Sequence, residues 1–366
     1  MRPPPDPRVT ATPTNHPAPD RGLSDIGLLG MPPIERLDHF MARANALYYA
    51  AHNPFTDFTT APQISQIFGE ILGLWCGVVW RAMGEPAPIC LVEAGPGGGA
   101  LMADALRAIR AMLPAMLPAL DMHFIETSPR FSAQLRARFP QAQLHATLDS
   151  LPDRPILLLA NEFLDALPIR QFIRTATPDA WQERYVQAGT PRTRPITPAD
   201  QIQLAPLAAQ TSPGAIREIN HAARAFTAAL AQRITRRGGA ALLIDYGPLE
   251  SGPGDTLQAI RAGASANPLA DPGQADLTAH VDFAALRACA TAQGCATAGP
   301  IAQGKFLAAL GIHERTAALG RNATPQQAAD LLAATRRLTA AEAMGGLFKA
   351  FALAPADLLP LPGFPA

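Results

Sequence analysis

A glycine-rich turn between two regular elements constrains the fold of this chain most strongly. Residues 89–92 form a continuously apolar run, the turn spans 93–99, and apolar residues then recur at helical spacing over 101–113. A buried strand, a tight turn and a helix in this order are typical of a doubly wound α/β sheet. Because ligands of such sheets bind at the carboxyl ends of the strands, we predict a ligand site at this turn.

Further apolar runs extend the same pattern. Strand-like segments occur at 122–125, 155–160 and 240–244, and a late strand is expected at 347–353. Helix-length segments, such as 128–139, separate several of them. This alternation predicts a Rossmann-like, mostly parallel sheet with helices on both faces.

The chain divides into four expected regions. Residues 1–22 are rich in Pro, Thr, Asp and Ala, a composition typical of a disordered arm. Residues 23–88 are predicted to form an N-terminal helical cap, whose main helix follows Thr60 in a capping box with Gln63. The α/β domain is expected at 89–354, with an insertion at about 173–211 that carries an extra hairpin, and a C-terminal tail at 355–366.

Composition excludes several classes of partner. The chain has 30 Lys and Arg against 30 Asp and Glu, with Lys305 and Lys349 as the only lysines, so no basic cluster predicts nucleic-acid binding. No apolar run approaches the roughly 20 residues of a membrane-spanning helix, and the first twenty residues lack the apolar run of a secretion signal. The four cysteines show no C-x-x-C spacing, which favours free thiols over a metal site. We expect a cytoplasmic protein without membrane insertion.

The residues around the turn indicate the class of cofactor. Their spacing is Glu93-x-Gly95-x-Gly97-x-Gly99, whereas dinucleotide sites usually show G-x-G-x-x-G. Glu93 would repel a pyrophosphate but can hold the ammonium of a methionine moiety, directly or through water. Glu126, which ends the next strand, can accept hydrogen bonds from ribose hydroxyls. These acids favour S-adenosylmethionine over a nicotinamide dinucleotide, although a dehydrogenase places an acid similarly and both acids can be incidental to a structural turn.

A third motif follows the strand at 155–160. Asn161, Glu162 and Asp165 stand at the expected carboxyl end of this strand, where two acids can hold a cationic substrate near a transferable methyl group. Equally, Asn161 can cap a short helix whose first-turn acids suit the helix dipole.

Six motifs, in order along residues 30–354, resemble the MidA family. They are PF at 54–55, DFTTAPQISQIFGE at 57–70, EAGPG at 93–97, NEFLDALP at 161–168, IDYG at 244–247 and DLTAHVDF at 276–283. The resemblance implies a class I methyltransferase that uses S-adenosylmethionine. Mitochondrial members of that family assist assembly of respiratory complex I as protein arginine methyltransferases.

The resemblance also implies roles for individual residues. The cofactor would be bound by Glu93, Gly95, Pro96, Gly97, Glu126 and Asn161. The segment that carries Phe58 and Gln66 would close over the cofactor, and residues 161–168 would border the substrate. We count Phe58, Gln66 and His280 as candidate substrate-binding residues, although His280 also fits a structural, hydrogen-bonded histidine.

The chain departs from the family pattern at three places. Only Thr56 separates Phe55 from Asp57, where the family has a longer loop that contains glycine. Gln63 stands where an acid is common, and Gly98 where arginine is common. These departures motivate the alternative of an assembly factor that keeps the cofactor fold without transferring methyl groups.

The expected reaction is methyl transfer to an arginine of a protein partner, with a complex I subunit as the candidate. Glu162 and Asp165 would orient the guanidinium through bidentate hydrogen bonds, and no metal is needed. A nicotinamide-dependent oxidoreductase is the other enzyme alternative, which Glu93 and the glycine spacing disfavour. By the resemblance, the enzyme would work in the cytoplasm of a bacterium or in the mitochondrial matrix of a eukaryote.

Overall fold

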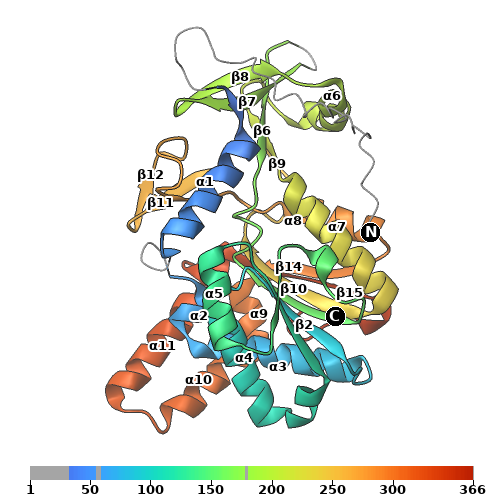
Figure 1. Ribbon diagram of the computed structural model, residues 1–366, viewed down its shortest axis with the longest axis vertical. Helices are drawn as coiled ribbons and strands as arrows, with labels where there is room; N and C mark the ends of the chain where they lie inside the picture. Colours follow the sequence, from blue (N-terminus) through green and yellow to red (C-terminus); the bar gives the residue numbers. More distant parts are fainter. Residues whose placement is uncertain (1–32, 55–58, 178–179, 366) are drawn as a thin grey trace, which may run out of the picture.

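A seven-stranded sheet forms the centre of the computed structural model, which describes residues 33–54, 59–177 and 180–365 (Figure 1). The strand order is β14-β15-β10-β5-β2-β3-β4, and β15 alone runs opposite to the other six strands. These strands are β2 (Ile89–Ala94), β3 (Leu120–Ile125), β4 (Gln143–His145), β5 (Ile156–Asn161), β10 (Gly239–Tyr246), β14 (Ala296–Ala302) and β15 (Phe348–Ala354). The predicted doubly wound, mostly parallel sheet is therefore confirmed.

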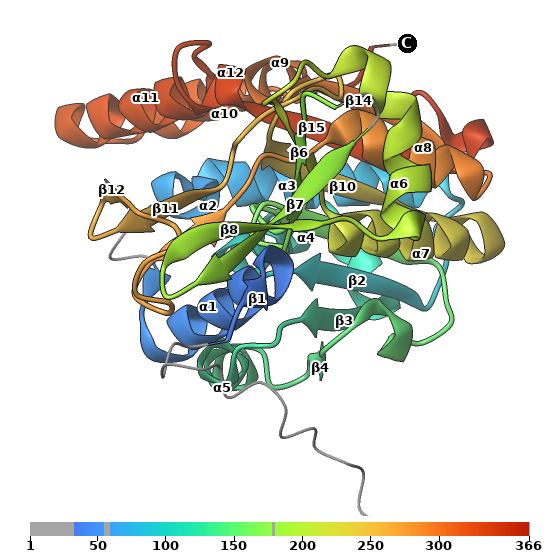
Figure 2. The ribbon, with the colours of Figure 1, turned by 90° about the horizontal axis from the view of Figure 1, so that it is seen from above.

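The direction of chain progression reverses between β2 and β5. From β2 the chain continues through β3 to β4 at one edge, as Figure 2 shows, and then returns to β5 on the other side of β2. Such a reversal opens a crevice at the carboxyl ends of the two strands, because the loops that follow them leave toward opposite faces. The glycine turn follows β2 directly and so stands at this crevice.

Helices cover both faces of the sheet because the strand residues alternate between two apolar cores. Ile89 and Leu91 pack in the core beneath α3 and α4, whereas Cys90 and Val92 pack in the core beneath α7 and α8. The longer helices are α1 (Leu37–Ala51), α3 (Gln66–Ala82), α4 (Ala100–Met112), α5 (Pro129–Arg138), α7 (His221–Arg237), α8 (Phe283–Ala292), α10 (Ile312–Gly320) and α11 (Pro325–Thr339). The shorter ones are α2 (Ala61–Ile64), α6 (Pro198–Leu204), α9 (Gln303–Ala309) and α12 (Met344–Leu347), with 3-10 turns η2 (Pro114–Ala119), η3 (Leu148–Ser150), η4 (Ala205–Gln210) and η5 (Ala356–Leu358).

The predicted capping box at Thr60 is wrong. The helix breaks at Ser65, whose extended backbone (φ −155°, ψ 131°) separates the single turn α2 from α3. Ser65 is the cap instead, because its hydroxyl oxygen accepts a hydrogen bond from the Ile67 N–H at 3.2 Å. The Thr60 side chain makes no capping bond.

Helix α3 packs against α4 and belongs to the core of the sheet. Its residues Phe68, Leu72 and Trp75 share one apolar core with the strand residues Leu91 and Leu157. The expected boundary at residue 88 therefore does not separate two apolar cores. The part of the expected cap that stands apart from this core is α1.

Glycines at 69, 73 and 77 line the face of α3 that contacts α4, so the two helices approach closely. A Cβ at Gly73 would lie 2.5 Å from the Ala105 Cα, which is too close for any carbon. We expect Gly73→Ala to lower the free energy of unfolding by about 1–3 kcal/mol, despite alanine's higher helix propensity, because backbone must move. Thermal unfolding followed by circular dichroism measures this effect.

Gly320→Ala is the matched control, because a Cβ there meets nothing within 4 Å. We expect the control to keep or slightly raise the melting temperature. Equal melting temperatures for the Gly73 variant and the wild type would show that the α3–α4 crossing relaxes without cost.

A second sheet lies at the end of the molecule opposite α10 and α11 (Figure 1). The predicted hairpin is present as β7 (Trp181–Gln187) and β8 (Thr190–Pro195). The sheet also includes β1 (Glu35–Arg36), β6 (Arg170–Arg174) and β9 (Ile216–Ile219), so it extends beyond the expected 173–211 insertion. A small third sheet comprises β11 (Gln258–Arg261), β12 (Ala264–Ala266) and β13 (Asp276–Thr278).

A buried ion-pair cluster fixes the second sheet. Arg170 contacts Glu183 at 2.6 Å and Asp200 at 2.7 Å, and all three side chains are almost completely buried. Since Arg170 lies two residues after the 161–168 motif, this cluster holds the end of that motif against the insertion.

Two expectations lie on residues outside the described part of the chain. These are the disordered arm at 1–22 and the short connection between Phe55 and Asp57, with Phe58. Within the described residues, no helix is both long enough and apolar enough to cross a membrane.

Candidate cofactor and substrate site

A cavity of about 1170 Å³ opens at the crevice between β2 and β5. The residues that end β2, β3 and β5 form one side of it, and α1, β11 and β13 form another. The volume is slightly larger than the usual range for small-molecule sites, about 300–1,000 Å³. The cavity therefore has room for a cofactor and for part of a substrate.

The glycine turn lines one side of this cavity. Gly95, Gly97 and Gly99 have φ of 69°, 51° and 71°, a region that residues with a Cβ rarely adopt. A Cβ at Gly95 would lie 2.9 Å from the Phe163 ring. Gly95, Pro96 and Gly97 all line the cavity, as predicted for the cofactor turn.

Glu93 presents a buried carboxyl to the same cavity. Its exposed fraction is 4%, and burial raises its pKa from an ordinary 4.5 to about 8, with partial offset by a hydrogen bond to the Met102 backbone. Its Oε2 atom has no hydrogen-bond partner among the described residues. An acceptor without a partner at this place suits a ligand cation, such as the ammonium of a methionine moiety.

Glu126 is fixed where β3 ends. Its Oε1 accepts a hydrogen bond from the Ser128 N–H at 2.7 Å, and burial raises the pKa of its carboxyl. The Ser128 hydroxyl in turn donates to the Tyr49 carbonyl at 2.9 Å, which ties this strand end to α1. Both glutamates therefore face a common cavity from neighbouring strands, as the assignment of S-adenosylmethionine requires.

Glu162 has a strained backbone and a buried side chain at the end of β5. Its φ is 52°, and burial raises the pKa of its carboxyl to about 7. Oε1 accepts hydrogen bonds from the Ala61 N–H at 3.1 Å and from the Asn161 amide at 3.0 Å. This carboxylate thus anchors the first residue of α2 over the cavity.

No helix follows Asn161, so the alternative that it caps one is wrong. The segment 162–168 is instead an irregular loop, held by the Asp245 carboxylate of β10, which accepts hydrogen bonds from the Leu164 and Asp165 N–H groups at 2.9 and 3.2 Å. Burial raises the pKa of Asp165 well above its ordinary value, and the nearby carboxyls Asp245, Asp276 and Glu162 raise it further.

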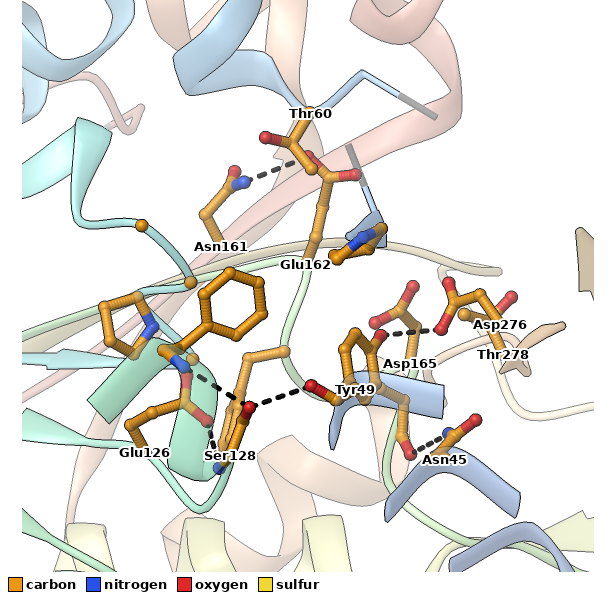
Figure 3. Close-up of a pocket in the computed structure, with 18 of the residues that line it drawn as sticks. Asn45, Tyr49, Thr60, Glu126, Ser128, Asn161, Glu162, Asp165, Asp276 and Thr278 are labelled. Atoms are coloured by element: carbon orange, nitrogen blue, oxygen red, sulfur yellow. Dashed lines mark hydrogen bonds between the residues drawn. The ribbon is translucent and has the colours of Figure 1, made fainter. Parts of the chain in front are cut away.

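Sequence reasoning missed one wall of the cavity. Tyr49 on α1 and Asp276 and Thr278 on β13 lie near Asp165, as Figure 3 shows. Asn45 on α1 lines the same wall and donates its amide to the Ala166 and Leu277 carbonyls. The Tyr49 hydroxyl donates to Asp276 Oδ1 at 2.6 Å. Asp276 is the first residue of the motif at 276–283, and this position is the signal in the sequence that could have identified it.

The candidate substrate-binding residues are placed differently from one another. Gln66 is exposed on α3 and does not line the cavity, whereas Gln63 does. His280 is also exposed and outside the lining; its ring packs edge-on against Tyr246 with centroids 5.5 Å apart. Phe58 lies outside the described residues, so contact of all three with substrate stays a prediction.

A cation stands near position 98 although the residue there is glycine. The Arg138 guanidinium of α5 donates to the Gly98 carbonyl at 2.8 Å. Its charge also lowers the pKa of Glu93, against the larger effect of burial. The positive charge that the family motif carries on the turn thus comes here from a different element.

Comparison with known proteins agrees with this geometry. Residues 71–301 match a family model described as an S-adenosyl-L-methionine-dependent methyltransferase. A Drosophila melanogaster protein, named protein arginine methyltransferase NDUFAF7 homolog, mitochondrial, is 33% identical over 91% of this chain and 85% of its own length. The human mitochondrial NDUFAF7 is 33% identical over 82% of this chain and 74% of its own.

Solved structures share the fold over nearly the whole chain. A COG1565 superfamily member from Burkholderia thailandensis, bound to S-adenosyl-homocysteine, superposes with a TM-score of 0.71 at 24% identity and covers 89% of this chain and 90% of its own. A native COG1565 structure from the same organism gives 0.74 at 26% identity, with 90% of each chain covered. The cofactor is therefore S-adenosylmethionine and not a nicotinamide dinucleotide, and the chain belongs to the S-adenosylmethionine-dependent methyltransferase family that includes NDUFAF7 and corresponds to the predicted MidA family.

Proposed function

We propose that this methyltransferase modifies an arginine side chain of a protein. The observation that supports it most is the group of carboxyls Glu162, Asp165 and Asp276, which lie together in the cavity beyond the cofactor turn. Buried carboxyls repel one another unless a cation enters, and the guanidinium is a cation with five N–H donors. The relatives named as protein arginine methyltransferases support the same substrate class.

The proposed chemistry is an in-line displacement. The bound cofactor supplies an electrophilic methyl group on a sulfonium sulfur, and loss of that methyl leaves the neutral thioether S-adenosylhomocysteine. A guanidinium is a poor nucleophile because its charge is delocalised, so Glu162 and Asp165 would orient it through bidentate hydrogen bonds. One of these carboxylates would take the N–H proton as the new N–C bond forms, and the raised pKa of Glu162, about 7, suits a proton acceptor near neutral pH.

We infer further that the substrate belongs to respiratory complex I, as the MidA resemblance implies. The enzyme would then work where that complex is assembled, in the bacterial cytoplasm or in the mitochondrial matrix. Nucleic acid is not proposed as a partner, because the equal numbers of acidic and basic residues supply no excess positive charge.

Mass spectrometry of complex I from cells with and without this gene tests the proposal. We expect one arginine, within the hydrophilic subunits, to carry methyl groups only when the gene is present. Incubation of the purified enzyme with the unmethylated complex and isotope-labelled S-adenosylmethionine should restore the label at that arginine. Label on lysine, on another residue type or on a small molecule would contradict arginine as the acceptor.

A non-catalytic assembly factor is the second candidate, motivated by the shortened segment after Phe55 and by Gly98. This candidate predicts tight binding of S-adenosylhomocysteine and of a complex I subunit, with no methyl incorporation. Arg138 beside Gly98 argues against it, because the missing charge is replaced.

A further inference from the structure

The cavity continues beyond the cofactor turn along one face of α1. The lining residues of this helix recur at helical spacing: Ala42, Asn45, Ala46, Tyr49 and Ala50. The alanines at 42, 46 and 50 are exposed, so this face leaves room beside the helix. Opposite it lie the lining residues Gln258 and Ile260 of β11 and Asp276 and Thr278 of β13. This part of the cavity, here called the passage, therefore runs between α1 and the small sheet that contains β11 and β13, outside the central sheet.

Asp276 lies at the inner end of this passage and is set in place by α1. Its exposed fraction is 4%, and its Oδ1 accepts the Tyr49 hydroxyl at 2.6 Å (Figure 3). Burial, and then the Asp276 charge, hold the pKa of Tyr49 well above its ordinary value, so the hydroxyl stays protonated and remains a donor. The position of the carboxylate is thereby fixed before any substrate binds.

The interactions of Glu162 and Asp165 differ from those of Asp276. Glu162 uses one oxygen to anchor the Ala61 N–H, and Asp165 belongs to the loop that Asp245 holds. The charge of Asp276 raises the pKa of both Glu162 and Asp165, which places the three carboxyls within electrostatic reach of one another. Of the three, Asp276 is the one whose carboxylate is oriented by a side chain from the wall of the passage.

Two buried oxygen atoms in the cavity accept no hydrogen bond from the described residues. Asn161 Oδ1, beside Glu162, and Glu93 Oε2, at the cofactor end, are both buried and have no hydrogen-bond partner in the described part of the chain. A ligand rich in N–H groups would satisfy such acceptors, because a buried acceptor without a donor costs about 1–3 kcal/mol. Because Glu93 Oε2 already suits the cofactor ammonium, Asn161 Oδ1 is the atom that indicates a further donor-bearing ligand beside Glu162.

Resting on the proposed function, we propose that Asp276, positioned by Tyr49, is the recognition residue for the substrate guanidinium, and that the arginine-bearing segment of the protein substrate enters along the Ala42–Ala46–Ala50 face of α1. The planar guanidinium can bind one carboxylate through two N–H groups and still offer three others. A lysine ammonium lacks that fork geometry, so this arrangement selects arginine over lysine.

Isothermal titration calorimetry on the full chain, saturated with S-adenosylhomocysteine, tests this inference without need for turnover. The probe is the peptide acetyl-Gly-Gly-Arg-Gly-Gly-amide, with its citrulline counterpart as the neutral isostere. We expect the wild type to bind the arginine peptide at least about tenfold more tightly than the citrulline peptide. Asp276→Asn keeps an acceptor for Tyr49 but removes the charge, and should weaken that preference more than any other variant in this titration, because only Glu162 and Asp165 then remain to attract the cation.

Asp271→Asn is the matched control. Asp271 is exposed, lies outside the cavity lining and has a φ of 44°, which asparagine tolerates. The control should keep the wild-type preference for arginine over citrulline. Equal binding of both peptides by the wild type, or an unchanged preference in Asp276→Asn, would overturn the assignment of Asp276.

The variant Tyr49→Phe tests whether Tyr49 acts by positioning Asp276, which itself would contact the guanidinium. It keeps the ring and removes the hydroxyl that orients Asp276, so we expect the preference for arginine to weaken without disappearing. Affinity for S-adenosylhomocysteine, measured in the same cell, should stay unchanged in all variants, since none of these residues touches the glycine turn.

The two proposals fail separately. If the enzyme labels a residue other than arginine in complex I, the proposed function fails, whatever the peptides show. If arginine is labelled but Asp276→Asn keeps both its peptide preference and its KM for the protein substrate, only the assignment of Asp276 fails.

Discussion

Replacing Glu162 by alanine is expected to lower methyl transfer about 100-fold or more, the usual effect of removing one charge-stabilising group from an active site. Affinity for S-adenosylhomocysteine should change little, because the cofactor turn is on the neighbouring strand β2. Single-turnover methylation of the protein substrate, together with calorimetry for the cofactor product, measures both effects. Unchanged methylation by Glu162→Ala would remove the residue from the reaction.

Glu162→Gln distinguishes the charge of this residue from its structural bond. The glutamine oxygen still accepts the Ala61 N–H, so α2 stays anchored, but the variant cannot bind a guanidinium as an anion. We expect both variants to be inactive. Activity in Glu162→Gln but not in Glu162→Ala would show that the residue acts only by anchoring α2.

The carboxyl of Glu162 predicts that kcat/KM depends on pH. Burial raises the pKa of Glu162 to about 7, and the ionised form is the one that binds the substrate cation. The value of kcat/KM should therefore rise through pH 7 and level off above it. The rise should be absent from any residual activity of Glu162→Gln.

Replacing Glu93 by glutamine is expected to weaken binding of S-adenosylhomocysteine about 10- to 150-fold at pH 8.5, since a hydrogen bond to a charged group contributes about 1.5–3 kcal/mol. The reason is that Glu93 lines the cavity and its Oε2 has no protein partner among the described residues, so we propose that it pairs with the ligand ammonium. Calorimetry across pH 6–9 checks this. Glu85→Gln, at an exposed position outside the cavity lining, is the matched control.

Protons should be released when the cofactor binds. The free protein holds the pKa of Glu93 at about 8, so the carboxyl is largely protonated at pH 7 and must ionise to pair with the ammonium. Affinity of the wild type should therefore rise with pH up to about 8, and the Gln variant should lose this dependence. Equal affinities of wild type and variant at pH 8.5 would show that Glu93 does not contact the cofactor.

The stability of the ligand-free protein should follow the opposite trend. A carboxyl whose pKa is higher in the folded state than in the unfolded state binds more protons when folded. The contribution of Glu93 to the free energy of unfolding should thus be most favourable near or below its ordinary pKa of 4.5 and should decline as the pH rises toward 8. In Glu93→Gln this decline should be smaller.

The sequence alone determined the central sheet and the part of the cavity formed by the glycine turn and the strand-end acids. Apolar runs and the spacing of Glu93, Gly95 and Gly97 could be interpreted because strands, turns and strand-end acids are local features, set by neighbours along the chain. The carboxyl ends of adjacent parallel strands then necessarily share one edge, which brought Glu126 and Glu162 into the same cavity.

The rest of the cavity, formed by α1, α2 and β13, was decided only by the tertiary structure. The helix break at Ser65 was hidden because Thr60 and Gln63 supply an equally good local cap pattern, and the carboxylate of Glu162, about 100 residues away, anchors Ala61 instead. The pairing of Tyr49 with Asp276 joins residues separated by 227 positions, and no local pattern specifies such a contact. Local sequence therefore determined that the glycine turn and the strand-end acids meet at one cavity, whereas long-range packing of α1 against β13 determined that Tyr49 and Asp276 join them.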